Sequence, residues 1–177
     1  MSLKVESQTS KKLPRKTSQK ITSVIASLPS EHLIGIERIR IVDAIDDNRL
    51  TLHQKTSLPG LYHPRQGSQR AWLEVNATAL LPSDGGFFKK LIPRIAFYNN
   101  LSAILVSLVG QHYYISLRHS AKKGSLESSV RSYTTKHLKG INKSEHKLRA
   151  KIFAPLQPTL ERLAKSLNAK ARKRTSR

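Results

Sequence analysis

Residues 95–117 read IAFYNNLSAILVSLVGQHYYISL and contain no charged side chain. The stretch is long enough to cross a bilayer. A membrane span would, however, bury four polar side chains that are costly in lipid: Asn99, Asn100, Gln111 and His112. We therefore expect a helix in a protein core, within a helical region over residues 87–119 that bends or divides near Pro93, where the N–H is missing.

The segments before this helix alternate as strands do. Residues 33–42 (LIGIERIRIV) place isoleucines on one face and arginines on the other. Residues 70–75 (RAWLEV) alternate apolar residues with Trp72 and Glu74 in the same way. Residues 50–53 are a candidate for a further strand. Together these segments indicate a small antiparallel sheet.

Helices are expected both before and after these strands in the chain. Residues 18–28 have apolar side chains at helical spacing and end before a proline. A second helix is expected over residues 125–138, with Gly140 ending it, and residues 144–168 continue the helical pattern with two prolines that bend or split it. The predicted class is α+β, a small antiparallel sheet packed with a long central helix and further C-terminal helices.

The composition is that of a basic globular protein. The chain has 177 residues, with 32 lysines and arginines against 11 acids, and a formal net charge of +21. This composition excludes a collagen, a disulfide scaffold and a wholly disordered chain. Because there is no cysteine, thiol catalysis, iron–sulfur clusters and Cys-based zinc sites are also excluded.

The charge is concentrated at the two ends. Residues 1–20 hold six basic groups and one acid, and residues 136–177 hold thirteen basic groups and two acids. The middle holds thirteen basic groups and eight acids. We therefore divide the chain into four parts: a basic flexible extension over 1–20, an α+β domain over 21–140, a helical segment over 141–168 and a basic disordered tail over 169–177.

Flexible basic segments attract polyanions, because each phosphate contact releases counterions. We therefore expect a nucleic acid or a nucleoprotein as partner. The expected contacts fall into two sets, the N-terminal basic segment (Lys11, Lys12, Arg15 and Lys16) and the C-terminal basic tail (Lys170, Arg172, Lys173 and Arg174). Three alternatives stay open: an anionic membrane surface, a solvated surface without a partner, and a structural subunit whose tails thread into an assembly.

The start of the chain has no signal-peptide hydrophobic run, because lysines from Lys11 to Lys20 interrupt it. We expect a cytoplasmic protein without a transmembrane segment. Targeting to an organelle by the basic, Ser/Thr-rich start is left open, although lysine rather than arginine dominates there.

Ser107 and Gln111 are four residues apart in the central helix, and therefore lie on one helix face. The same spacing brings two histidines onto a zinc ion in the motif HExxH. Over residues 28–140 the chain resembles the zincin-like metallopeptidases of the HExxH type. The features that carry this likeness are the Leu-Pro before the isoleucine-rich strand, the Pro-Gly-Leu-Tyr loop, the RAWLEV strand, the helix with Gly110 and His112, and an acid on the following helix.

The resemblance implies two histidines and a catalytic glutamate on the first helix, with a third ligand from a later helix. Carried onto this chain, the histidines fall on Ser107 and Gln111, the general base falls on Leu108, and Glu127 keeps the third-ligand position. Serine and glutamine are poor zinc ligands, and leucine cannot take a proton from a metal-bound water. The resemblance therefore implies a zincin-like pseudo-peptidase that binds no metal and performs no catalysis.

The alternative is a metal-dependent hydrolase with a rearranged zinc site. His112 and His119 are seven residues apart, and Glu127 follows, so these three could form such a site. We favour the simpler interpretation that His112 is hydrogen-bonded in the core and His119 caps a helix end. The other histidines share no spacing, and Trp72 is expected to pack rather than to stack on a base.

Overall fold

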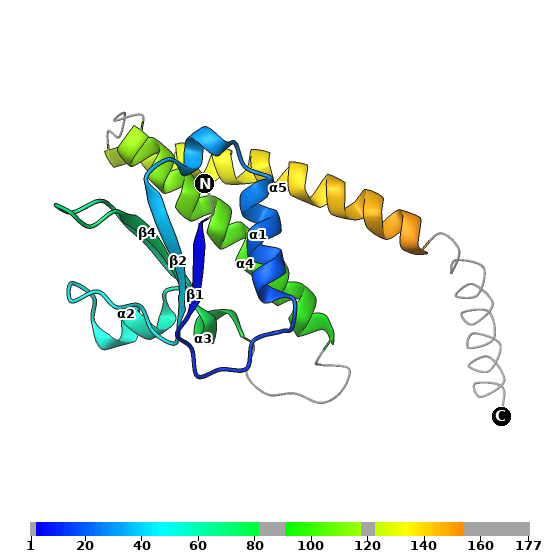
Figure 1. Cartoon of the computed structure of the whole chain (residues 1–177), viewed down its shortest axis with the longest axis horizontal. Coiled ribbons are helices and arrows are strands. Elements are labelled where there is room, and N and C mark those ends of the chain that lie inside the picture. The colour runs from blue at the N-terminus through cyan, green and yellow to red at the C-terminus, as the bar shows by residue number, and fades with distance from the viewer. Residues whose placement is uncertain (1–2, 82–90, 118–122, 154–177) are drawn as a thin grey trace, which may run out of the picture. The chain divides into compact units, whose positions relative to one another are not determined.

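The computed structural model describes residues 3–81, 91–117 and 123–153. The chain divides into two compact units, residues 1–138 and 139–177, and the first holds the sheet and the helices packed on it. Figure 1 shows these elements in chain order.

Four strands form one mixed sheet. They are β1 (Lys4–Ser7), β2 (Ile36–Val42), β3 (Gly60–His63) and β4 (Ala71–Asn76). Their order is β1-β2-β4-β3. β2 is parallel to both β1 and β4, whereas β3 is antiparallel to β4.

The class is α+β, as predicted, but the prediction of an antiparallel sheet is wrong. The chain passes through the helices α1 (Thr17–Ala26) and η1 (Ser30–Leu33) between β1 and β2, so β2 starts from the same end as β1. The link from β2 to β4 has a similar effect, because it contains a helix and β3. Such crossovers produce parallel pairs, and only the short β3–β4 link produces a hairpin.

β1 lies in the segment that we expected to be a flexible extension ahead of the domain. It instead forms an edge of the sheet, with Lys4 opposite Arg38 and Glu6 opposite Arg40. Four consecutive residues of mixed polarity carry little periodic signal, so β1 depends on pairing with β2 rather than on its own pattern.

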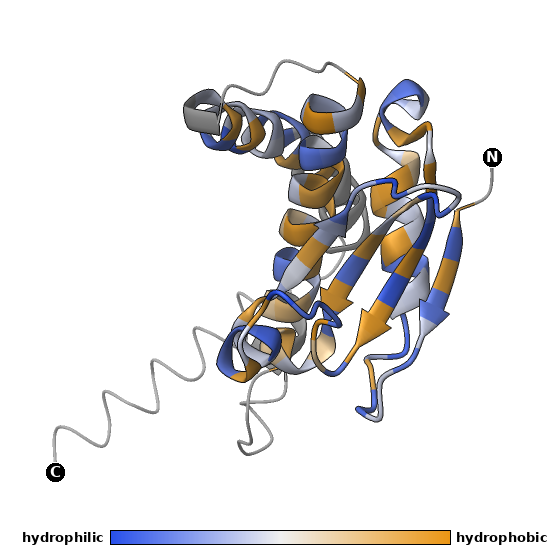
Figure 2. Cartoon of the chain, turned by 90° about the vertical axis from the view of Figure 1, so that its left-hand side faces the viewer, coloured by the Kyte–Doolittle hydropathy of each residue, from blue (hydrophilic) through white to orange (hydrophobic). Residues whose placement is uncertain are grey.

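The core lies on one face of the sheet. The side chains of Ile39, Ile41, Leu73 and Val75 are almost fully buried there. Apolar residues of α1 join them, and each fully buried Ile, Leu or Val contributes about 1.5–3 kcal/mol. Figure 2 shows the alternation of hydrophobic and hydrophilic residues along the strands that produces this arrangement.

The predicted core helix is confirmed as α4 (Leu91–His112), which packs against α1, β3 and β4. Among residues 96–112, whose burial is described, the buried ones are Phe97, Leu101, Ser102, Leu105, Val106, Leu108, Val109, Gly110 and His112. Pro93 lies in the first turn, where its missing N–H costs little, so the helix continues past it without division. A π-helical turn, η3 (Tyr113–Leu117), follows. In the part of the chain that is described, no helix has the length and apolarity to cross a membrane.

Two further predictions need correction. Residues 50–53 do not form a strand, because α2 (Leu52–Ser57) begins there with a capping box between Thr51 and Gln54. Leu52 is 80% exposed, so this apolar side chain does not face the core as a strand residue would. A short helix, α3 (Ala77–Leu80), follows β4.

Gly140 does not end the last helix, because α5 runs from Lys123 to Phe153 without interruption. A glycine in a helix interior costs about 1 kcal/mol relative to alanine, which the flanking turns of α5 can absorb. The helix predicted over 144–168 is therefore the continuation of α5 as far as Phe153. Its remainder, with Pro155 and Pro158, lies outside the described residues.

Candidate functional site

The residues to which the zincin resemblance pointed lie on two different sides of α4. Leu108 is 3% exposed, and its Cδ1 lies close to Gly60 of β3, so this side chain packs toward the sheet. Ser107 and Gln111 are partly exposed and lie toward α5. The spacing therefore placed Ser107 and Gln111 on a common face, and it left Leu108 apart from them.

A cavity of about 500 Å³ lies between α4 and the first part of α5. Its lining residues are Ser107, Gln111, Leu126, Glu127, Val130, Arg131, Thr134 and Thr135. Three of the four positions onto which the resemblance carries the zincin ligands and base, Ser107, Gln111 and Glu127, thus share one cavity, which has the volume of a small-molecule site. None of these lining residues is a histidine.

Glu127 stands at the exposed rim of this cavity. Its carboxylate accepts a hydrogen bond from Arg131, one helical turn later, at 3.0 Å. Both side chains are about four-fifths exposed, so the pair contributes only a few tenths of a kcal/mol. The acid is therefore positioned at the cavity but is already paired.

His112 lies in the core, and both of its ring nitrogens are hydrogen-bonded. Nε2 donates to the carbonyl oxygen of Ile34 at 2.8 Å, which leaves Nδ1 to accept from the hydroxyl of Tyr62 at 3.0 Å. The Tyr62 oxygen also contacts the hydroxyl of Ser116 at 2.7 Å. Burial lowers the pKa of His112, so the ring is neutral at pH 7.

The alternative metal site cannot be assembled from the described residues. His112 has no nitrogen left for a metal, Glu127 lies at the cavity rim, and His119 falls outside the described residues. Within residues 3–81, 91–117 and 123–153, no three His, Asp or Glu side chains are grouped so that they could hold a metal ion.

All four cations of the N-terminal basic segment are exposed. The segment lies in the loop between β1 and α1, at the lower side of Figure 1. α1 begins directly after it, with no acid in the first turn and no side-chain cap on its first N–H groups. The positive end of the helix dipole thus adds to the positive charge of the segment. The C-terminal basic tail falls outside the described residues.

Asp43 fixes the start of this loop to the end of β2. Its carboxylate accepts from the hydroxyl of Thr9 and from both the backbone N–H and the hydroxyl of Ser10, at 2.9 and 2.7 Å for Ser10. The hydrogen bonds from Thr9 and Ser10 lower the pKa of Asp43 to about 2. The basic segment is therefore a loop tied at both ends, rather than a free extension.

No protein family matches this sequence, and comparison with curated proteins and with solved structures finds no significant similarity.

Sequence reasoning missed a cluster of rings where η1, η3 and the first part of α5 meet. The Nδ1 of His32 lies 2.9 Å from the Tyr133 hydroxyl, and the His32 ring lies 4.0 Å from that of Tyr113. His137 packs on Tyr133 at 4.3 Å. The i, i+4 spacing of Tyr133 and His137 is the only sequence signal of this cluster, because its other members come from distant segments.

A buried pair, His63 and Glu74, was also missed. The imidazole Nε2 lies 2.9 Å from a Glu74 oxygen that also accepts the backbone N–H of Asp46. Glu74 is fully buried although it lies on the polar face of β4, because the loop after β2 covers it. Trp72 packs against His63 with the rings parallel and 4.3 Å apart, in line with the packing role expected for it.

Proposed function

We propose that the chain is a non-catalytic, zincin-like domain that binds nucleic acid or a nucleoprotein through its basic segments, without reading sequence. The observation that carries this proposal is the exposed N-terminal basic segment, held in place between Asp43 and α1. Four cations in a fixed loop beside a helix N-terminus are suited to successive phosphates. The net charge of +21 supports the same partner.

The non-catalytic part of the proposal is supported by the cavity between α4 and α5. Its hydroxyl and amide groups, from Ser107 and Gln111, are weak metal ligands. Leu108 packs toward the sheet and supplies no general base. A cavity with this lining can hold a small ligand by hydrogen bonds, and its one carboxylate, Glu127, is paired with Arg131.

The nucleic-acid proposal is tested by the salt dependence of binding. Deleting residues 1–20 would remove β1, so point substitutions are preferable. We expect Lys11→Ala with Lys12→Ala to lower the slope of log Kd against log salt by about 2, because each lost phosphate contact removes about 0.9 from it. Fluorescence anisotropy with labelled DNA and RNA, between about 50 and 200 mM salt, measures this slope.

The matched control is Lys136→Ala with Lys139→Ala, which removes two exposed lysines from α5. This control should leave the slope nearly unchanged. Equal slopes for wild type and the Lys11/Lys12 variant would overturn the role of the segment. A protein that binds anionic vesicles but no nucleic acid would overturn the partner. Replacing the C-terminal basic tail residues by alanine measures the second set of contacts in the same way.

The non-catalytic proposal is tested by elemental analysis of protein purified without chelator and freed of nucleic acid by high salt. We expect far less than one metal ion per chain. Near-stoichiometric zinc would overturn this proposal and favour the hydrolase, with His112→Ala and Glu127→Ala as the next variants.

A further inference from the structure

The link between β3 and β4 is a two-stranded arm that extends beyond the sheet. Residues 65–70 (RQGSQR) are all exposed. Gln66 and Gln69 exchange two backbone hydrogen bonds, which closes a two-residue turn with Gly67 at a φ of 57°. Glycine suits this position because hairpin turns of the primed types require a positive φ there. The arm projects to the left of the sheet in Figure 1.

Two arginines oppose each other in this arm. The ladder pairs His63 with Trp72 and then Gln66 with Gln69, so Arg65 and Arg70 are opposite each other in the same register. Opposed residues of a ladder point to the same side, and like charges in such a pair are destabilising. The segment from Gly60 to Leu73 contains no acid that could compensate. A bound anion would remove this repulsion.

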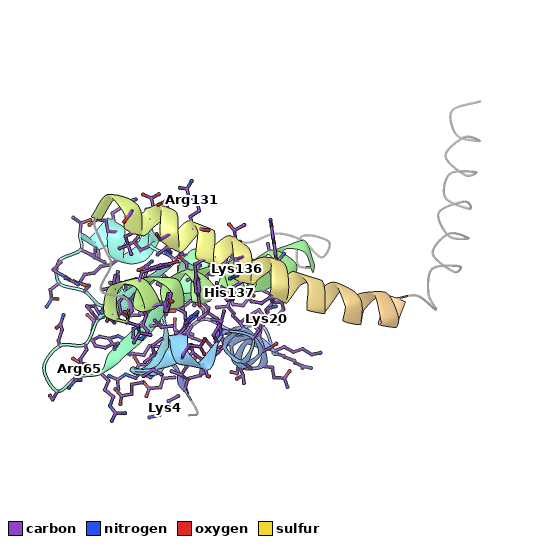
Figure 3. The ribbon with its side chains drawn as sticks, turned by 90° about the horizontal axis from the view of Figure 1, so that it is seen from above. Lys4, Lys20, Arg65, Arg131, Lys136 and His137 are labelled. Carbon is purple, nitrogen blue, oxygen red and sulfur yellow. The ribbon has the colours of Figure 1, made fainter. Side chains whose placement is uncertain are left out.

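The same side of the sheet carries a row of cations and rings. The register places Lys4, Arg38, Trp72 and His63 next to one another across all four strands, and we call them the cationic row. His63 is buried against Glu74, so Lys4 and Arg38 are the cations of the row that can reach a phosphate. Lys4 is three-quarters exposed and forms an ion pair with Glu6. In Figure 3 Arg65 and Lys4 lie on the same side of the first unit, away from Arg131 of α5.

Two buried N–H groups of the cationic row lack a hydrogen-bond partner within the described part of the chain. They are Nε of Arg38 and Nε1 of Trp72. A buried donor without a partner destabilises the folded protein, so both groups favour an added acceptor. The Arg38 guanidinium lies over the Trp72 ring, 5.9 Å from its centroid, and the Arg38 side chain is partly exposed, so both donors lie close to the surface at which an anionic acceptor would bind.

We propose that the arm and the cationic row form a docking surface for double-stranded DNA, with the arm in the major groove and the row on the flanking phosphates. This inference rests on the proposed function, since both require a nucleic-acid partner. It goes beyond that function because it names the duplex and a second surface, which lies at the opposite end of the strands from the N-terminal basic segment.

Three observations select the DNA duplex. A two-stranded ribbon fits the major groove of B-DNA, whereas the major groove of an RNA duplex is too narrow for side chains to read. The exposed amides of Gln66 and Gln69 at the tip are groups that pair with base edges. Single strands bind mainly by stacking on open aromatic faces, but the Trp72 ring is flanked by His63 from β3 and by the Arg38 guanidinium from β2, at 5.9 Å.

The test compares a short DNA duplex with its single strand and with the matching RNA duplex, by fluorescence anisotropy over a range of salt. We expect Arg65→Ala with Arg70→Ala to lower the salt slope on the DNA duplex by about 2, and to change binding of the other two probes much less. Gln66→Ala with Gln69→Ala should weaken binding to the duplex without changing the slope, because no charge is lost.

The Lys136/Lys139 variant again serves as the matched control. If the Arg65/Arg70 variant behaves as this control does while wild type still binds with a steep salt slope, the docking surface is wrong and the proposed function stands. If the variant loses single-strand or RNA binding equally, the choice of duplex DNA is wrong. If wild type binds none of the probes, the proposed function itself fails.

A circular-dichroism melt shows whether each variant is folded. A second variant, Arg70→Glu, places a carboxylate opposite Arg65, so it should stay folded while losing binding.

Discussion

At the scale of single residues, His112 shows how a residue that suggested chemistry serves structure. Its two nitrogens connect α4 to Ile34, after η1, and to Tyr62 of β3, so one ring joins three parts of the chain. This agrees with the interpretation of His112 as a core residue. The network requires the neutral ring, because a protonated Nδ1 cannot accept the Tyr62 hydroxyl.

We therefore expect acid to destabilise the protein through His112. Burial lowers the pKa of His112 in the folded chain. Below the unfolded value of about 6.5, the unfolded state therefore binds more protons than the folded state, and the free energy of unfolding decreases as the pH decreases. Above that pH the contribution is fully present. Urea unfolding between pH 8 and pH 5 measures it, and a His112→Gln variant should show a smaller fall than wild type. An equal fall in both would assign the effect to other groups, such as His32 and His137, whose pKa values burial also lowers.

Asp43 makes a prediction about the N-terminal basic segment. Replacing Asp43 by asparagine removes the charge that holds Thr9 and Ser10, so trypsin should cut after Lys11 and Lys12 faster than in wild type. The control is Asp47→Asn, because Asp47 binds Arg49 within its own loop. Similar cleavage of both variants would show that the segment is not held by Asp43. Because the pKa of Asp43 is lowered to about 2, its stabilising contacts with Thr9 and Ser10 should persist above pH 4 and be lost as pH falls toward 2.

At the scale of elements, the contact between α4 and α5 depends on the absence of a side chain at Gly110. A Cβ at this position would lie 2.9 Å from Cδ1 of Tyr133, which is almost fully buried. We expect Gly110→Ala to destabilise the protein by about 1–3 kcal/mol, although alanine is the better helix former. Gly140 is the matched control, because a Cβ there meets nothing within 4 Å. Gly140→Ala should stabilise by about 0.5–1 kcal/mol in the same thermal melt. Stabilisation by both would mean that Tyr133 moves freely.

The zincin resemblance makes a prediction about α4. Ser107→His with Gln111→His would place two imidazoles one turn apart, facing Glu127 across the cavity. We expect the double variant to bind one zinc or cobalt ion, measured by elemental analysis and by the cobalt absorption bands. Adding Glu127→Gln should weaken that binding. A double variant that binds no metal would show that this cavity lacks the geometry of the family.

Sequence reasoning reached the elements whose signal is local. The strands around Ile39 and Leu73 alternate strongly, and both were predicted, as was the core helix α4. The i, i+4 spacing also predicts that Ser107 and Gln111 share one helix face, and both line the cavity beside α5, whereas their correspondence to zinc ligands stays a prediction. β1 and the cluster around Glu74 are held by pairing between distant segments, and in the cluster around Tyr133 only the i, i+4 spacing of Tyr133 and His137 is a local signal. Because β1 was not predicted, the first crossover, from β1 through α1 to β2, was not predicted either, and the sheet was expected to be antiparallel.

At the scale of the whole first unit, the sheet separates its two cationic surfaces. The N-terminal basic segment follows the carboxyl end of β1, whereas the cationic row and the arm lie at the end where the parallel strands begin. The acid Glu74 is buried between these ends, with Arg40 and His63 beside it. The net charge of +21 is therefore not distributed evenly, and variants at the two ends of the strands measure separate contacts.

The position of β1 has a consequence for how the chain can be shortened. A truncated chain that starts after Ser10 would lose only one acid and one base, yet it would leave the N–H and C=O groups of β2 without their partner strand. Bare edges of this kind pair with other chains. We expect such a truncation to form dimers or larger aggregates in size-exclusion chromatography, and a monomer as stable as the full chain would contradict this. By covering the edge of β2, the first ten residues are thus expected to prevent self-association, a role that their composition does not indicate.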